Sequence, residues 1–111
     1  MWVNGAVFTN PGGGQVLADS GIIPGGVYEV SVIIQHSVQA IVFLERRNVA
    51  DTVTLQNFKM RLATGFYTSP PLTGIEIING ERLRVSLNAG ITGEIEADIF
   101  LILRQDLLRV R

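Results

Sequence analysis

Apolar and polar residues alternate with a period of two along most of the chain, and Gly, Pro and Asn separate the alternating runs. A period of two places successive side chains on opposite faces of a β-strand, whereas no stretch keeps the period of an amphipathic helix. About eight such runs, each the length of a strand, follow one another along the chain. The sequence therefore predicts an all-β fold, a two-sheet antiparallel sandwich with jelly-roll or Greek-key connections.

The two clearest runs, residues 27–35 and 38–46, each place a row of apolar side chains on one face. An antiparallel pairing that sets Val32 opposite Ala40 brings both rows onto the same face of one sheet. It also leaves residues 35–37 as a three-residue loop. We therefore expect these two runs to form a β-hairpin.

A second pair of runs, residues 82–87 and 94–103, meets the same requirement. The register that keeps their apolar rows together also sets Arg84 opposite Asp98 on the outer face, where opposite charges stabilise a strand pair. Before these runs, Asn79-Gly80 resembles a two-residue hairpin turn. That turn would mix the two faces, so a three-residue loop or a crossing from one sheet to the other is expected instead.

Weaker patterns predict strands over residues 15–19, 52–62 and 66–78, and Pro70-Pro71 inside the last of these favours an edge strand or a bend. Residues 2–8 are either a first strand or an arm. The chain accordingly divides into an N-terminal arm and Gly-rich hinge, a β-sandwich domain and a C-terminal tail, over residues 1–14, 15–104 and 105–111.

Several apolar side chains lie on the strand faces opposite the predicted core. A monomer that exposed them would carry a large apolar patch, and such patches mark interaction sites. We expect them to form an oligomer interface, the alternative being that loops or termini of the same chain cover them. The side chains are Ile33, Ile41, Phe43, Phe100 and Ile102.

Both ends of the chain also carry apolar side chains. Two interpretations remain open: the end segments contact a partner as arms, or they complete the sandwich. The residues are Trp2, Val3 and Phe8 at the N-terminal end, and Leu107, Leu108 and Val110 at the C-terminal end.

Charge and composition argue against nucleic-acid and membrane partners and exclude cysteine chemistry. The formal net charge is −1, with 9 basic and 10 acidic residues, so no basic excess indicates a nucleic-acid partner. No apolar run approaches the roughly 18 residues of a membrane helix, and no membrane partner is expected. The absence of cysteine excludes disulfides, thiolate metal sites and cysteine nucleophiles.

No constellation of residues predicts catalysis. The run Gly12-Gly13-Gly14 lacks the Lys-Ser/Thr of a phosphate-binding loop and is interpreted as a linker. Glu94, Glu96 and Asp98 alternate along one strand and are expected to form a solvated edge rather than a cation site. His36 falls in the predicted hairpin loop, with no acid beside it to orient it. We therefore expect no enzyme activity, no catalytic residue, no metal and no cofactor.

Three segments carry a resemblance to a known family. In residues 21–32 (GIIPGGVYEVSV) a Pro-Gly turn precedes a long alternating strand. Residues 80–87 (GERLRVSL) form a second alternating strand, which Thr92-Gly93 and a closing strand follow. Residues 46–51 (RRNVAD) lie between them. Over residues 15–104 the chain resembles the small β-sandwich virion proteins of tailed bacteriophages, of the capsid decoration or cement type.

The resemblance implies a non-enzymatic structural protein of the viral particle, made in the host cytoplasm and located on the capsid surface of the virion. It implies a homotrimer that bridges subunits of the major capsid protein and so stabilises the shell. The apolar strand faces would form the trimer contact, and the terminal arms would grip the capsid. The alternative is a phage tail module or a receptor- or carbohydrate-binding β-sandwich, for which Phe66-Tyr67 is the candidate aromatic pair.

Overall fold

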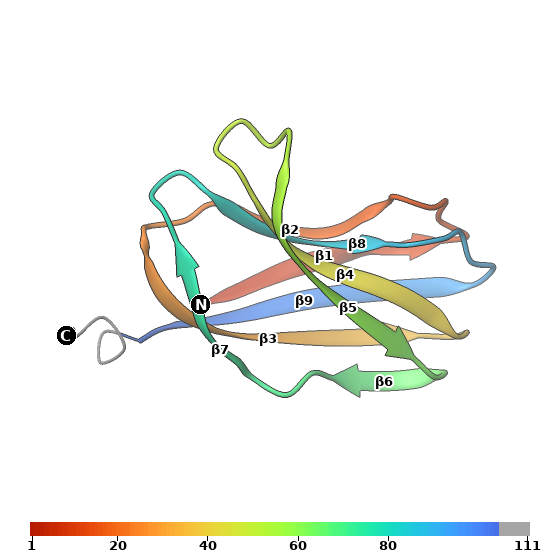
Figure 1. Ribbon diagram of the computed structural model, residues 1–111. Helices are drawn as coiled ribbons and strands as arrows, with labels where there is room; N and C mark the ends of the chain where they lie inside the picture. Colours follow the sequence, from red (N-terminus) through yellow and green to blue (C-terminus); the bar gives the residue numbers. More distant parts are fainter. Residues whose placement is uncertain (105–111) are drawn as a thin grey trace.

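The structure, a computed structural model, describes residues 1–104, which form nine β-strands (Figure 1). Among these residues there is no helix that could span a lipid bilayer. The strands are β1 (Trp2–Thr9), β2 (Val16–Ile22), β3 (Gly26–His36), β4 (Ala40–Arg47), β5 (Thr54–Leu62), β6 (Gly65–Thr68), β7 (Leu72–Ile77), β8 (Arg82–Leu87) and β9 (Glu94–Leu103).

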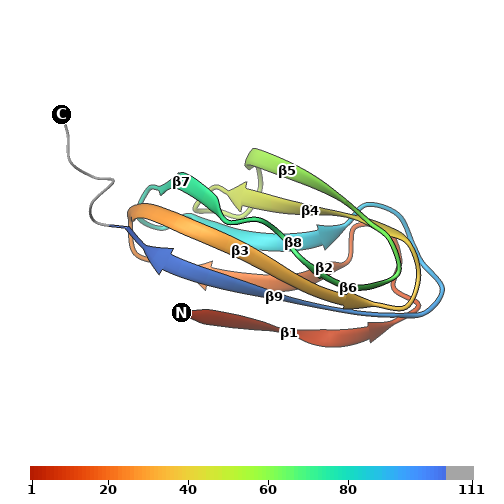
Figure 2. The ribbon, with the colours of Figure 1, turned by 90° about the horizontal axis from the view of Figure 1, so that it is seen from below.

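Two antiparallel sheets make up the two layers visible in Figures 1 and 2. Sheet A has the order β1-β9-β3-β6, with β7 also paired to β3, and sheet B has the order β2-β8-β4-β5. Most consecutive strands therefore lie in different sheets, which is the arrangement of a jelly roll. The predicted all-β, two-sheet sandwich is confirmed.

The core lies between the sheets and is built from the inward rows of the alternating strands. In β3 every second side chain from Tyr28 to His36 is buried, and in β9 every second side chain from Ile95 to Leu101 is buried. The facing sheet contributes a matching row from β4, β5 and β8. The largest fully buried side chains are Leu17, Val30, Val32, Ile34, Val42, Leu44, Ile77, Leu83, Leu87, Ile95, Ile99 and Leu101.

The predicted hairpin of residues 27–35 and 38–46 is wrong. Strand β3 pairs with β9, β6 and β7 in sheet A, whereas β4 pairs with β5 and β8 in sheet B. Val32 and Ala40 are both buried, as predicted, but they face the core from opposite sheets. The predicted rows of inward side chains were therefore correct, and the strand partners were not, because a crossing between sheets buries the same rows as a hairpin does.

The predicted pair of residues 82–87 and 94–103 is wrong for the same reason. Strand β8 lies between β2 and β4, and β9 lies between β1 and β3. Arg84 consequently pairs with Glu45 rather than with Asp98. The crossing that was one of the two options at Asn79-Gly80 is confirmed, since β7 and β8 lie in different sheets.

The shorter predicted strands are present. Strand β2 overlaps the run 15–19 but begins at Val16, and β5 occupies the run 52–62 from Thr54 onward. Pro70-Pro71 separates β6 from β7 at the edge of sheet A. Of the two interpretations of residues 2–8, the structure has the strand: β1 pairs with β9, and part of the predicted N-terminal arm thus belongs to sheet A. A register shift between Asn4 and Val7 lets both Val3 and Phe8 face the core, which explains why this segment packs rather than extends.

Gly5 lies where the edge strand β1 of sheet A closely approaches β2 of sheet B. A Cβ at this position would overlap the carbonyl oxygens of Ala97 in β9 and Leu17 in β2. We expect Gly5→Ala to lower the unfolding free energy by about 3 kcal/mol, the upper part of the usual range for overpacking. For a domain of this size that corresponds to a loss of roughly 15 °C in Tm.

Thermal denaturation followed by circular dichroism measures this effect. Gly12→Ala is the matched control, because a Cβ there meets nothing within 4 Å, and its Tm should stay at the wild-type value. Equal Tm values for the two variants would contradict the close approach of the sheets at Gly5.

Candidate functional site

An aromatic pair, one exposed ring and one half-buried ring, lies on the outer face of sheet A. Trp2 in β1 and Phe100 in β9 are direct partners in the strand register. Their ring centroids are 4.7 Å apart with the planes inclined at 45°. Trp2 remains 54% exposed, so about half of the residue is open to solvent.

The local sequence of β1 explains why Trp2 is held on this face. Val3 is turned onto the core, and the alternation over residues 2–4 therefore directs Trp2 and Asn4 outward. The register shift between Asn4 and Val7 then lets Phe8 face the core as well. The backbone N–H of Leu101 donates a 2.8 Å hydrogen bond to the carbonyl oxygen of Met1, which ties the start of the strand to β9. The indole is thus supported by a paired strand rather than by a loop.

Two polar side chains flank the aromatic pair. Ser31 is the partner of Phe100 on β3, and Asn4 follows Trp2 on the same face of β1. Within residues 1–104 neither side chain makes a hydrogen bond, so the hydroxyl and the amide are available to a ligand. The nearby Asp98 carboxylate, in contrast, accepts a 2.9 Å hydrogen bond from the Gly5 N–H. We call Trp2, Phe100, Asn4 and Ser31 the aromatic patch.

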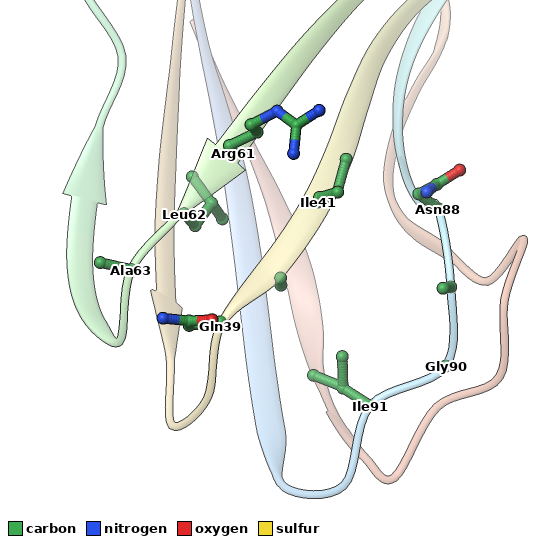
Figure 3. A pocket seen from close by; sticks show the side chains of 10 residues that line it. Gln39, Ile41, Arg61, Leu62, Ala63, Asn88, Gly90 and Ile91 are labelled. Atoms are coloured by element: carbon green, nitrogen blue, oxygen red, sulfur yellow. The ribbon is translucent and has the colours of Figure 1, made fainter.

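A groove on the other sheet is the second candidate (Figure 3). It has a volume of about 480 Å³ and opens between the start of β4, the end of β5 and the loop from β8 to β9. The Asn88 N–H donates a 2.9 Å hydrogen bond to the Ile41 carbonyl oxygen. Beyond this bond the loop from β8 to β9 diverges from β4, and the divergence creates the opening. Ile41 and Ile91 supply apolar surface, and the polar side chains of Gln39, Arg61 and Asn88 line the remainder.

The other charged side chains of sheet B are largely engaged with one another. The Glu45 carboxylate is nearly buried and accepts hydrogen bonds from Arg84 (2.8 Å), Ser86 (2.7 Å) and Thr54 (2.8 Å). Burial alone would raise the pKa of Glu45, but these three hydrogen bonds and the Arg84 charge lower it below its ordinary value. The network stabilises the sheet and offers no free group to a ligand.

Further ion pairs on this face engage the guanidinium groups of Arg46 and Arg47. Arg46 pairs with Glu81 at 2.7 Å, and Arg47 pairs with Asp51 at 2.9 Å. The hydrogen bond from Arg47 also lowers the pKa of Asp51. Each of these guanidinium groups already has a carboxylate partner within the chain.

The five apolar residues predicted to form an oligomer interface are divided between the two outer faces. Ile33, Phe100 and Ile102 lie on sheet A, and Ile41 and Phe43 lie on sheet B. None of the five is buried by the chain, and Ile102 is 39% exposed. Their role as an interface stays a prediction, and no single contact surface on one copy contains all five.

The residues predicted as partner-contact arms have different environments. Trp2 is exposed, whereas Val3 and Phe8 are partly buried against the core of the chain itself. Leu107, Leu108 and Val110 lie outside the described residues. In the predicted aromatic pair, Phe66 is 69% exposed but Tyr67 packs against the core, so the two rings do not form one surface.

His36 is not the exposed loop residue that was predicted. It is the last residue of β3, is 5% exposed, and its Nδ1 donates to the Val38 carbonyl oxygen at 2.6 Å. The prediction was wrong because it rested on the hairpin loop that does not form. In residues 1–104 no group of three or more His, Asp or Glu side chains is placed to hold a metal ion.

Comparisons with known proteins identify the fold and no family. No family model matches the chain, and no curated protein matches it. A solved structure of a carbohydrate-binding module, described as "CBM4 structure and function", is similar with a TM-score of 0.54 and 13% sequence identity. The match covers 93% of this chain and 94% of that chain. At this identity the likeness establishes the β-sandwich fold alone.

The hydrogen bonds to Glu45 predict a specific dependence of stability on pH. Because the pKa of Glu45 is lower in the folded protein than its ordinary value of 4.5, the unfolded chain binds more protons as the pH falls. The stabilisation is complete above that ordinary value and is lost as the pH falls through the folded pKa. We expect Glu45→Gln to lower the unfolding free energy by about 2 kcal/mol at pH 7 and to make the acid-induced loss shallower.

Urea denaturation at a series of pH values measures both effects. The control is Glu76→Gln, since Glu76 is exposed and makes no ion pair with any residue of the described part. It should retain the wild-type profile. A Glu45→Gln profile that runs parallel to wild type would contradict the assigned role of this carboxylate.

Proposed function

We propose that the protein is a non-catalytic carbohydrate-binding β-sandwich module whose binding surface is the aromatic patch of sheet A. The observation that carries the proposal is the half-exposed Trp2 ring, supported by Phe100 and flanked by the unpartnered side chains of Asn4 and Ser31. These groups come from three neighbouring strands of one sheet. Such a surface requires no movement of the backbone to receive a ligand.

The chemistry of a sugar matches this arrangement. One face of a pyranose ring presents C–H groups, which pack on an aromatic ring, while the hydroxyl groups at its edge need hydrogen-bond partners. Trp2 provides the aromatic surface, and the Asn4 amide and Ser31 hydroxyl provide a donor and an acceptor each. A neutral glycan fits better than an anionic one, because the Asp98 carboxylate lies in the adjacent row.

The fold is consistent with the proposal. The similar solved structure is a carbohydrate-binding module and covers nearly the whole of both chains. A shared fold supports the class of function by analogy only, and the aromatic patch itself is the direct support.

Loss of the indole should abolish most of the binding. We expect Trp2→Ala to weaken the affinity for a neutral polysaccharide or oligosaccharide, first identified on a glycan array, by at least about tenfold, or 1.4 kcal/mol. Isothermal titration calorimetry measures the change. Phe66→Ala is the matched control, because it removes a more exposed aromatic ring from the same sheet and should leave the affinity unchanged.

Two results would overturn the assignment. Wild-type protein that binds no neutral glycan on the array would exclude the function. Glycan binding that survives Trp2→Ala but is lost in Asn88→Ala would move the site to the groove of Figure 3.

A second candidate function is favoured by the apolar side chains on both outer faces. Ile33 and Ile102 on sheet A, and Ile41 and Phe43 on sheet B, are all left at least partly exposed. In this proposal the protein is a homotrimeric decoration protein on a capsid surface, with the major capsid protein as its partner. Its support is the resemblance of the turns and alternating strands to such proteins. A closed trimer in size-exclusion chromatography with light scattering would favour it over glycan binding by a monomer.

A further inference from the structure

The two sheets carry opposite charge. Every Lys and Arg in the nine strands of the described chain belongs to sheet B. These residues are Arg46, Arg47, Lys59, Arg61, Arg82 and Arg84. The strands of sheet A contain only acidic ionisable side chains besides His36 and the tyrosines, and their carboxylates are Glu29, Glu76, Glu94, Glu96 and Asp98.

Most of the cations of sheet B are neutralised inside the chain, and two are not. Arg46, Arg47, Arg82 and Arg84 each have a carboxylate within 4 Å, whereas Lys59 and Arg61 are exposed and make no ion pair with residues 1–104. Strand pairing sets Lys59 beside Phe43 and Arg61 beside Ile41. We call these four residues the basic face.

Sheet A has the complementary surface. One row across its strands contains Val7, Glu96, Gln35 and Phe66, with Glu94 two residues before Glu96 on the same side of β9. Val7 is 56% exposed and Phe66 is 69% exposed. Neither Glu94 nor Glu96 has a side-chain partner in the described part of the chain. We call Val7, Glu94, Glu96 and Phe66 the acidic end.

We propose that copies of this protein associate head to tail, the acidic end of one copy docking on the basic face of the next. Each surface holds two exposed or partly exposed apolar side chains beside two unpaired charges of one sign. Contact between them would cover apolar area and pair all four charges at once. A hollow of about 260 Å³ at the acidic end and the groove of about 480 Å³ beside the basic face can receive protruding side chains of the partner copy.

The geometry decides the kind of assembly. The basic face and the acidic end lie on opposite outer faces of the sandwich, so one copy can use both surfaces simultaneously. A heterologous contact between opposite faces repeats as an open stack and does not close into a small ring. The acidic end shares the outer face of sheet A with the aromatic patch, because Asn4 is the register partner of Asp98, two positions and about 7 Å from Glu96 along β9. The two sets have no residue in common, so substitutions at Trp2 and at Glu94 and Glu96 test glycan binding and association separately.

Size-exclusion chromatography with light scattering tests the proposal on the full chain. At low ionic strength the wild-type mass should rise with concentration beyond that of a dimer, and added salt should lower the mass at each concentration. The double variants Lys59→Glu/Arg61→Glu and Glu94→Lys/Glu96→Lys should each remain monomeric, because like charges then meet. Mixing the two variants should restore the assembly, since opposite charges again face each other.

Controls separate this proposal from the others. All four side chains are exposed or partly exposed on strands, so both double variants should keep the wild-type circular dichroism spectrum and Tm. Trp2→Ala should stack like wild type even if it loses glycan binding. A wild-type monomer at all concentrations in low salt, a closed trimer, or double variants that retain the wild-type mass would each overturn the head-to-tail contact.

Discussion

The insertion of β9 between β1 and β3 is the interaction on which the rest of the structure depends. Its inward row, from Ile95 to Leu101, fills the centre of the core, and its two edges supply the hydrogen bonds of both neighbouring strands. Without β9, strand β1 has no partner in sheet A. Because β9 is the last of the nine described strands, sheet A is completed only when the two ends of the chain meet. Such long-range pairing is slow to form, since loop closure precedes the gain in contacts.

This constraint also explains what the sequence could and could not predict. The alternation in β3 and β4 correctly identified Val32 and Ala40 as inward residues, because side-chain period depends only on the local backbone. It did not identify strand neighbours. A hairpin and a crossing between sheets bury the same rows of side chains. The local sequence therefore cannot show whether Val32 lies beside Ala40 in one sheet or faces it across the core from the other sheet. Because the predicted hairpin does not form, the environment predicted for His36 in its loop was wrong as well.

The aromatic patch was missed for the same physical reason. Trp2 was assigned to an arm and Phe100 to an interface, and the two lie nearly the whole length of the chain apart. Only the register of β1 on β9 brings the rings together. Alternation within β1 does not predict that both Val3 and Phe8 face the core, because this depends on the register shift between Asn4 and Val7. The groove beside Ile41 had no sequence signal at all, because it exists where a loop diverges from a strand.

The distribution of charge leaves unpaired charges of opposite sign on the two outer faces of the sandwich. On sheet B, burial of Glu45 is tolerated because three donors satisfy its carboxylate, and this internal pairing leaves Lys59 and Arg61 as the cations free to meet a partner. On sheet A, no cation lies within the strands to neutralise Glu94 and Glu96. A net charge near zero therefore conceals two surfaces of opposite sign. Apolar side chains accompany the free charges on both surfaces, so attraction would be reinforced by burial of apolar area rather than depend on screened charge alone.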